Sequence, residues 1–173
     1  MRRKLFCVVL AALLALSVYS SLQAKRQQRE VTQEVLSQMR YNLMLLFQCT
    51  ETFHEKTEEN VYFGGDISFV EERLAVLVSN LQIYSTLYPK DYLGLKDLSA
   101  DCVTALQRLR YGTEETQKKA LRSLLALVEY MRLYTDDMAL PNRKEFLEMN
   151  ETAKQAMEEG NYYQLHHDIM TLH

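Results

Sequence analysis

Residues 5–53 read LFCVVLAALLALSVYSSLQAKRQQREVTQEVLSQMRYNLMLLFQCTETF, and this stretch contains neither glycine nor proline. Its first 20 residues, Leu5 to Ala24, carry no charge. As a helix this run would reach roughly 30 Å, the thickness of the hydrocarbon core of a bilayer. Because no helix breaker follows the run, we expect one continuous helix that starts as a transmembrane helix and enters a folded domain.

The apolar run is flanked by bases, since three precede it and Lys25 and Arg26 follow it directly. A cleavable signal peptide has a shorter apolar stretch of roughly 7–15 residues and ends at a small-x-small site. The best such site, Leu22-Gln23-Ala24, has a bulky residue at its first position. We therefore favour an uncleaved membrane anchor over residues 1–24, and a signal peptide of a secreted protein is the alternative.

Charge is distributed unevenly along the chain. The formal net charge is −3, yet residues 1–29 hold six bases and no acid, so residues 30–173 hold 14 bases and 23 acids, a net −9. The positive-inside rule places the N-terminus in the cytoplasm and residues 25–173 outside the cell membrane. An acidic domain lacks the clustered Lys and Arg that phosphate contacts need, so we expect no nucleic-acid partner.

Helix-breaking residues are scarce. Gly and Pro number 5 and 2 in 173 residues, whereas they make up about 12% of an average protein. Phosphate-cradling loops, nucleophile elbows and dinucleotide folds all need glycines at tight turns, and long sheets need frequent turn residues. The composition therefore predicts an all-α protein.

The spacing of apolar residues and breakers places the helices. The first helix runs on over residues 30–58 and is stopped by Gly64-Gly65. Asp66 and Ser68 are candidate N-caps of a second helix to about Leu87. The apolar stripe of the first helix is Val31, Val35, Met39, Leu43, Leu46, Thr50 and Phe53.

Four more segments follow. Residues 88–94 form a connection, and the third helix runs from about Leu95 to Tyr111. Thr113 caps a fourth helix, which ends near Thr135 before a break over 136–141. The spacing of Asn142 and Glu145 predicts a capping box for a fifth helix, ended by Gly160, and a short sixth segment covers 161–173.

Consecutive amphipathic helices with short links favour antiparallel neighbours. We therefore expect an up-down four-helix bundle over residues 25–140, with a C-terminal helical hairpin over 141–173 packed on it. In this arrangement the second and fourth helices end on the side of the membrane. Five tyrosines should gather there: Tyr84, Tyr88, Tyr92, Tyr130 and Tyr134. They would form an aromatic interaction cluster or simply pack the bundle end, and we favour packing.

The cysteines allow two interpretations. Cys49 and Cys102 each lie on or beside an apolar stripe of the exported part. In an oxidising compartment they could form a disulfide that closes a loop of about 50 residues. The alternative, which we favour, is that both are small apolar side chains in the core.

The C-terminus is rich in metal-ligand side chains, namely His166, His167, Asp168 and His173. Adjacent histidines point about 100° apart on a helix, and residues seven apart lie about 10 Å apart, too far for one metal ion. We therefore treat the group as a weak metal candidate and expect no cofactor. Asn150-Glu151-Thr152 matches the N-glycosylation sequon, a short pattern that also arises by chance.

The sequence thus indicates a non-catalytic protein with its anchor at residues 5–24 in the lipid bilayer. Its helical bundle would have a structural or sensory role through a protein partner or self-association. The alternative function is a small-ligand binder or metal-dependent enzyme that uses the Tyr-rich end or the C-terminal histidines.

Overall fold

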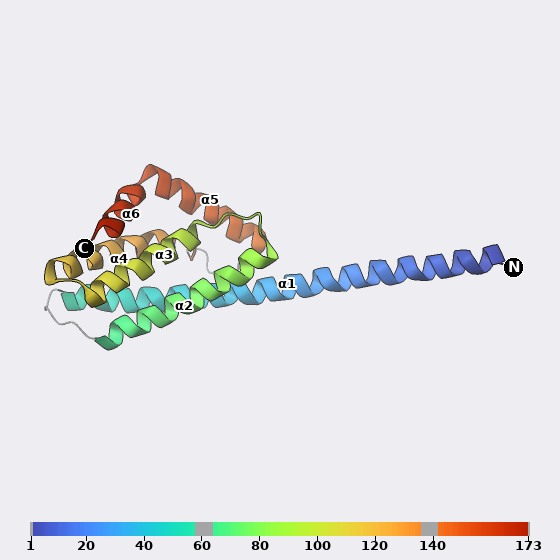
Figure 1. The fold of residues 1–173 in the computed structure, drawn as a ribbon, viewed down its shortest axis with the longest axis horizontal. Helices are drawn as coiled ribbons and strands as arrows, with labels where there is room; N and C mark the ends of the chain where they lie inside the picture. The colour runs from blue at the N-terminus through green and yellow to red at the C-terminus, as the bar shows by residue number, and fades with distance from the viewer. Residues whose placement is uncertain (1, 58–63, 136–141, 173) are drawn as a thin grey trace.

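The computed structural model describes residues 2–57, 64–135 and 142–172, and these residues form six α-helices without a strand (Figure 1). The predicted all-α class is therefore confirmed. The helices are α1 (Arg2–Thr57), α2 (Gly64–Leu87), α3 (Gly94–Tyr111), α4 (Glu114–Arg132), α5 (Arg143–Glu159) and α6 (Tyr162–Thr171).

The first four helices pack as an up-down bundle. Helix α1 lies mainly against α2 and α3 mainly against α4, while α2 also packs on α3 and α1 on α4. Successive helices run in opposite directions, so the chain reverses at each connection (Figure 1). This arrangement is the one that short links between amphipathic helices favour.

The core is built from the apolar stripes of these helices, but the stripe of α1 differs from its prediction. Val31 is 44% exposed, whereas its neighbour Thr32 is buried because its hydroxyl reaches the Tyr88 hydroxyl of α2 at 2.8 Å. Leu36 and Phe47 join the core in its place. The side chain of Phe53 lies outside the described residues.

Two predicted helix starts are confirmed and one is wrong. Thr113 caps α4, and Asn142 forms a reciprocal capping box with Glu145 at the start of α5. Helix α2, however, begins at Gly64, so Asp66 and Ser68 lie inside it. The Ser68 hydroxyl accepts a hydrogen bond from Arg110 Nη2 on α3 at 2.9 Å, which ties it to a neighbouring helix. The predicted break over 136–141 lies outside the described residues.

Helices α5 and α6 form a bent hairpin over α3 and α4 (Figure 1). The turn between them needs a glycine, because a Cβ on Gly160 would stand 2.4 Å from the Tyr130 hydroxyl and 2.8 Å from the Ala156 carbonyl. The hairpin buries apolar side chains against the bundle: Phe146, Ala153, Met157, Tyr162 and Ile169.

Helix α1 is continuous, as predicted, and its N-terminal half projects from the bundle (Figure 1). Residues 12–27 are all exposed, and among the described side chains of α1 the first hydrogen bond to the bundle comes from the Gln28 amide, which donates to the Leu87 carbonyl at 3.3 Å. In the part of the chain that the structure describes, no helix combines the length and apolarity needed to cross a membrane, so the predicted transmembrane helix is not supported. The side chains of residues 5–9 and of Ala11 lie outside the described ones.

Candidate functional site

Three of the five predicted tyrosines meet at the end of the bundle from which α1 projects. Tyr84 lies 5.0 Å from Tyr88 and 5.3 Å from Phe146, measured between ring centroids. Tyr134 lies 5.9 Å from the same Phe146 ring. Because Tyr84 and Tyr134 are almost fully buried, this group is part of the packed core of the bundle end.

An ion pair joins the start of α5 to this group. The Arg143 guanidinium donates to both carboxylate oxygens of Asp91 at 2.8 to 3.1 Å, and the Tyr84 hydroxyl donates to the same carboxylate at 3.0 Å. The guanidinium also stacks over the Tyr88 ring, 4.2 Å from its centroid. Burial and the hydrogen bond to Asp91 raise the pKa of Tyr84, so its hydroxyl stays protonated as the donor.

A buried amide makes the second polar contact between the α5–α6 hairpin and the bundle. Asn150 is 0% exposed. Its Oδ1 accepts from the Gly94 backbone N–H and from the Tyr134 hydroxyl, and its Nδ2 donates to the Tyr92 carbonyl, each at 2.9 Å. The Asn150 amide of the sequon is thus enclosed in the folded protein.

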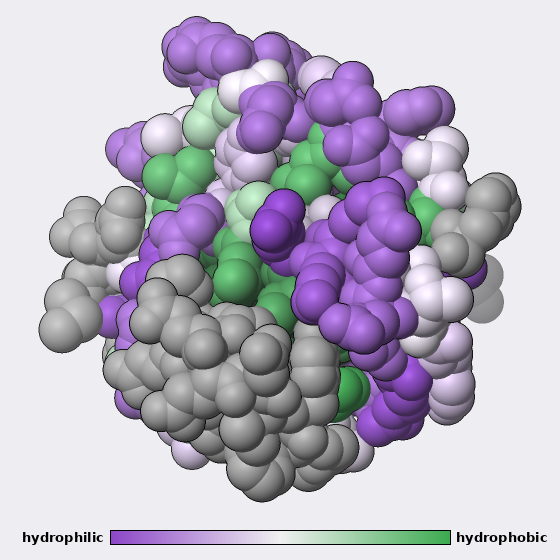
Figure 2. Space-filling model, turned by 90° about the vertical axis from the view of Figure 1, so that its left-hand side faces the viewer, coloured by the Kyte–Doolittle hydropathy of each residue, from purple (hydrophilic) through white to green (hydrophobic). Residues whose placement is uncertain are grey.

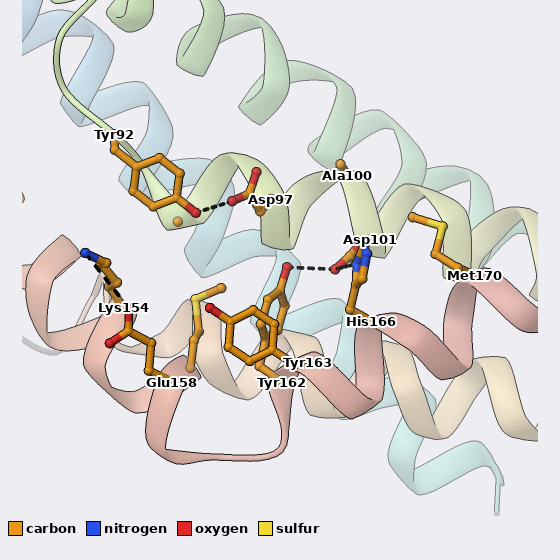
Figure 3. Close-up of a pocket in the computed structure, with 12 residues that line it drawn as sticks. Tyr92, Asp97, Ala100, Asp101, Lys154, Glu158, Tyr162, Tyr163, His166 and Met170 are labelled. Atoms are coloured by element: carbon orange, nitrogen blue, oxygen red, sulfur yellow. Dashed lines mark hydrogen bonds and ion pairs between the residues drawn. The ribbon is translucent and has the colours of Figure 1, made fainter.

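A buried carboxylate makes the third polar contact between the hairpin and the bundle. Asp101 of α3 is 1% exposed and accepts from the Tyr162 hydroxyl at 2.9 Å, while His166 Nδ1 lies 2.9 Å from both of its oxygens (Figure 3). A carboxylate oxygen accepts, so we take His166 Nδ1 as the donor in this contact. Burial, followed by the bond to Asp101, raises the pKa of Tyr162.

The other two predicted tyrosines lie apart from the Tyr84 group. The Tyr92 side chain is 57% exposed, and its hydroxyl donates to Asp97. The Tyr130 ring lies 6.0 Å from that of Tyr162, and its hydroxyl donates to Asn161 Oδ1 at 3.1 Å. Tyr84, Tyr88 and Tyr134 therefore form one group, whereas Tyr130 packs against Tyr162 of α6 and the Tyr92 hydroxyl is bonded to Asp97 of α3.

The C-terminal histidines point in different directions. His166 faces Asp101, whereas His167 is exposed and Asp168 accepts from Gln164 at 2.6 Å on the same helix. His173 lies outside the described residues. Among the residues with described side chains, no three of the types His, Cys, Asp and Glu are grouped as ligands of one metal ion.

The two cysteines of the bundle are both thiols, and no disulfide joins Cys49 to Cys102 in the structure. Cys102 is 0% exposed, and burial raises the pKa of its thiol. Cys49 is partly buried and packs against the core. Both positions thus match the core-packing interpretation.

Sequence reasoning missed Asp101 and Asn150, although a signal was present. Asp101 lies three residues after Leu98, and Asn150 lies four residues after Phe146, so each occupies an apolar-stripe position of its helix. A polar residue at such a position is buried only when it finds hydrogen-bond partners. The partners lie 16 to 65 residues away along the chain and carry no sequence signal of their own.

These contacts frame a groove between α3 and the α5–α6 hairpin with a volume of about 450 Å³. Figure 3 shows Tyr92, Asp97 and Asp101 on the α3 side and Tyr162, Tyr163 and His166 on the α6 side. The groove combines aromatic rings, carboxylates and an oriented imidazole, so it can hold a small polar molecule by contact and charge. Comparisons with family models, curated proteins and solved structures give no match to this chain.

Proposed function

We propose that this protein is a helical bundle held at a cell membrane by residues 5–24, with residues 25–173 outside the cytoplasm, and that it acts by protein interaction. The observation that carries the proposal is the apolar surface of the projecting half of α1. Leu13, Leu16 and Leu22 are 58%, 64% and 61% exposed. Residues 10–24 carry no charge.

Leaving these side chains in water is costly. Each fully covered Leu or Val side chain is worth about 1.5–3 kcal/mol relative to an exposed one. The exposed Leu13, Leu14 and Leu16 follow one another closely, so they point to different sides of the helix. Lipid surrounds a helix on every side, whereas one partner helix covers a single face. This favours a bilayer as the cover.

The opposite end of the molecule has a different surface. Viewed from that end, hydrophilic side chains dominate outside the grey atoms, and hydrophobic residues are visible only in the gaps between them (Figure 2). A hydrophilic far end is compatible with a domain that extends away from a membrane into water. A secreted bundle, released by cleavage after the apolar run, is the alternative.

Vesicle flotation of the full chain tests the anchor. We expect protein reconstituted from detergent into phosphatidylcholine–phosphatidylglycerol vesicles to float with them and to resist carbonate extraction. The double variant Leu13→Glu, Leu16→Glu should neither float with the vesicles nor resist extraction, because each charge at a helix centre costs about 2.5–3.5 kcal/mol. The matched control is the double variant Val78→Glu, Ile83→Glu, since these two residues of α2 are 40% and 43% exposed. Equal flotation of both variants would contradict the proposal.

Photocrosslinking in membranes tests the interaction. Tyr41 of α1 and Tyr111 of α3 are 57% and 79% exposed, so benzoylphenylalanine at either site leaves the core intact. We expect a discrete adduct larger than the monomer from at least one site, either with a second copy or with another protein. Monomer alone at both sites would count against a role in protein interaction.

A further inference from the structure

The groove between α3 and the α5–α6 hairpin has two aromatic walls. Tyr92 lines one side, and Tyr163 lines the other (Figure 3). Their side chains are 57% and 63% exposed, and the Tyr163 ring is held edge-on against Tyr162, 5.5 Å between centroids. The faces of such rings attract cations through their quadrupole.

The same groove is acidic. Among the described residues, its lining includes the carboxylates of Asp97, Asp101 and Glu158, the ammonium group of Lys154, and the His166 imidazole, which lies against Asp101. Lys154 Nζ lies 4.0 Å from Glu158 Oε1. Within the described residues, no Lys or Arg is ion-paired with Asp97 or Asp101.

The ionisation of Tyr92 reflects this negative charge. The hydrogen bond to Asp97, then burial, raises the pKa of Tyr92 to about 12, and repulsion from Asp97, Tyr163 and Glu158 adds to the shift. The smaller, Coulombic part of this shift comes in part from the Asp97 and Glu158 carboxylates, and the same charges attract a cation to this wall.

The lining also selects the kind of cation. Two thioethers, Met157 and Met170, line the groove beside the tyrosines. Hard metal ions prefer a shell of oxygen ligands, whereas rings and thioethers suit an ion that carries its own apolar surface. The volume, about 450 Å³, falls in the range of about 300–1,000 Å³ of small-molecule sites.

We propose that the groove binds a small organic cation, with its alkylammonium group against the faces of Tyr92 and Tyr163 and its charge toward Asp97. The buried contacts of Asp101 with Tyr162 and His166 hold α6 against α3, and thereby hold the two walls in place. This site is independent of the membrane anchor.

The test uses the full chain in a non-ionic detergent, with methyl-labelled methionine observed by NMR. Choline is the probe, and 3,3-dimethylbutan-1-ol is its neutral analogue of nearly the same shape. We expect choline to shift the Met157 and Met170 methyl signals saturably, at constant ionic strength. The alcohol should bind at least about tenfold more weakly, because it lacks the charge. Equal affinity, or no saturable shift with choline, would overturn the proposal.

Two variants then locate the site. Tyr163→Leu keeps apolar bulk and removes the ring, and Asp97→Asn keeps an oxygen that can accept from Tyr92. We expect each to weaken choline binding about fivefold or more. Tyr111→Leu is the control, since Tyr111 is exposed at the far end of α3 and outside the groove. Unchanged affinity in both groove variants would refute the assignment.

A peptide titration distinguishes the source of the cation. Acetyl-Gly-Lys-Gly-amide presents the same ammonium group on a polypeptide. We expect it to bind no more tightly than choline. If it binds about tenfold more tightly, the groove is a site for a basic side chain, and the small-molecule assignment is wrong.

Discussion

Replacing Asn150 by alanine should detach the α5–α6 hairpin without unfolding the bundle. The substitution removes three hydrogen bonds of 2.9 Å at a side chain that is 0% exposed. Each is worth about 1 kcal/mol net, and more if the partner left behind finds no water. We therefore expect a loss of about 3 kcal/mol, which corresponds to roughly a hundredfold change in the opening equilibrium.

Hydrogen exchange of the full chain measures this loss helix by helix. Amides of α5 should lose roughly a hundredfold of protection. Those in the centres of α1 and α2 should change little, because the three hydrogen bonds of Asn150 go to neither helix. Thr152→Ala is the control, since within the described residues its hydroxyl bonds to the Glu148 carbonyl on its own helix and to no group of the bundle. Less than a tenfold change in α5, or an equal loss in α1, would refute the reasoning.

Three further outcomes are expected. Gly160→Ala should lower the melting temperature, because the new Cβ meets the Tyr130 hydroxyl at 2.4 Å, and Tyr130→Phe should restore part of the loss. The raised pKa of Tyr92, about 12 against 10.0 for a free tyrosine, means that its contribution to stability is complete below pH 10 and disappears as the pH rises through 12. Tyr92→Phe should therefore flatten the alkaline limb of a stability–pH curve. In a Cys7→Ser background, the buried Cys102 thiol should react with a thiol reagent only on unfolding, and Cys49 should react first. Simultaneous reaction of both thiols in the native protein would contradict this.

The helices themselves were predictable because the chain is rich in periodic apolar residues and poor in breakers. The cap at Thr113 and the capping box at Asn142 follow from local hydrogen bonds within three residues, which a sequence displays directly. Gly64 was predicted to lie between two helices, whereas it begins α2. A glycine can lie in the first turn of a helix as well as between helices, and spacing alone does not distinguish the two.

The exchange of Val31 for Thr32 in the core shows a different limit. Apolar periodicity assigns valine to the buried face, yet the structure buries threonine because a tyrosine hydroxyl on α2 is its partner at 2.8 Å. Thr32 and Tyr88 are 56 residues apart in the sequence. A tertiary hydrogen bond of this kind becomes visible only when the register of two helices is known.

The polar contacts of the hairpin indicate that it is held in one position and not merely attached. Apolar side chains of similar size can exchange neighbours at little cost, so an apolar face alone leaves helices free to shift by a turn. A shift of one turn, about 5.4 Å, would leave the Asp91, Asp101 and Asn150 groups without partners, at about 1–3 kcal/mol for each buried group. The three contacts lie at the start of α5, in its middle and on α6, so they fix the hairpin along its whole length. Because Tyr163 lies beside Tyr162 on α6, the same contacts set the width of the groove, and a ligand that fits between its walls meets them already in place.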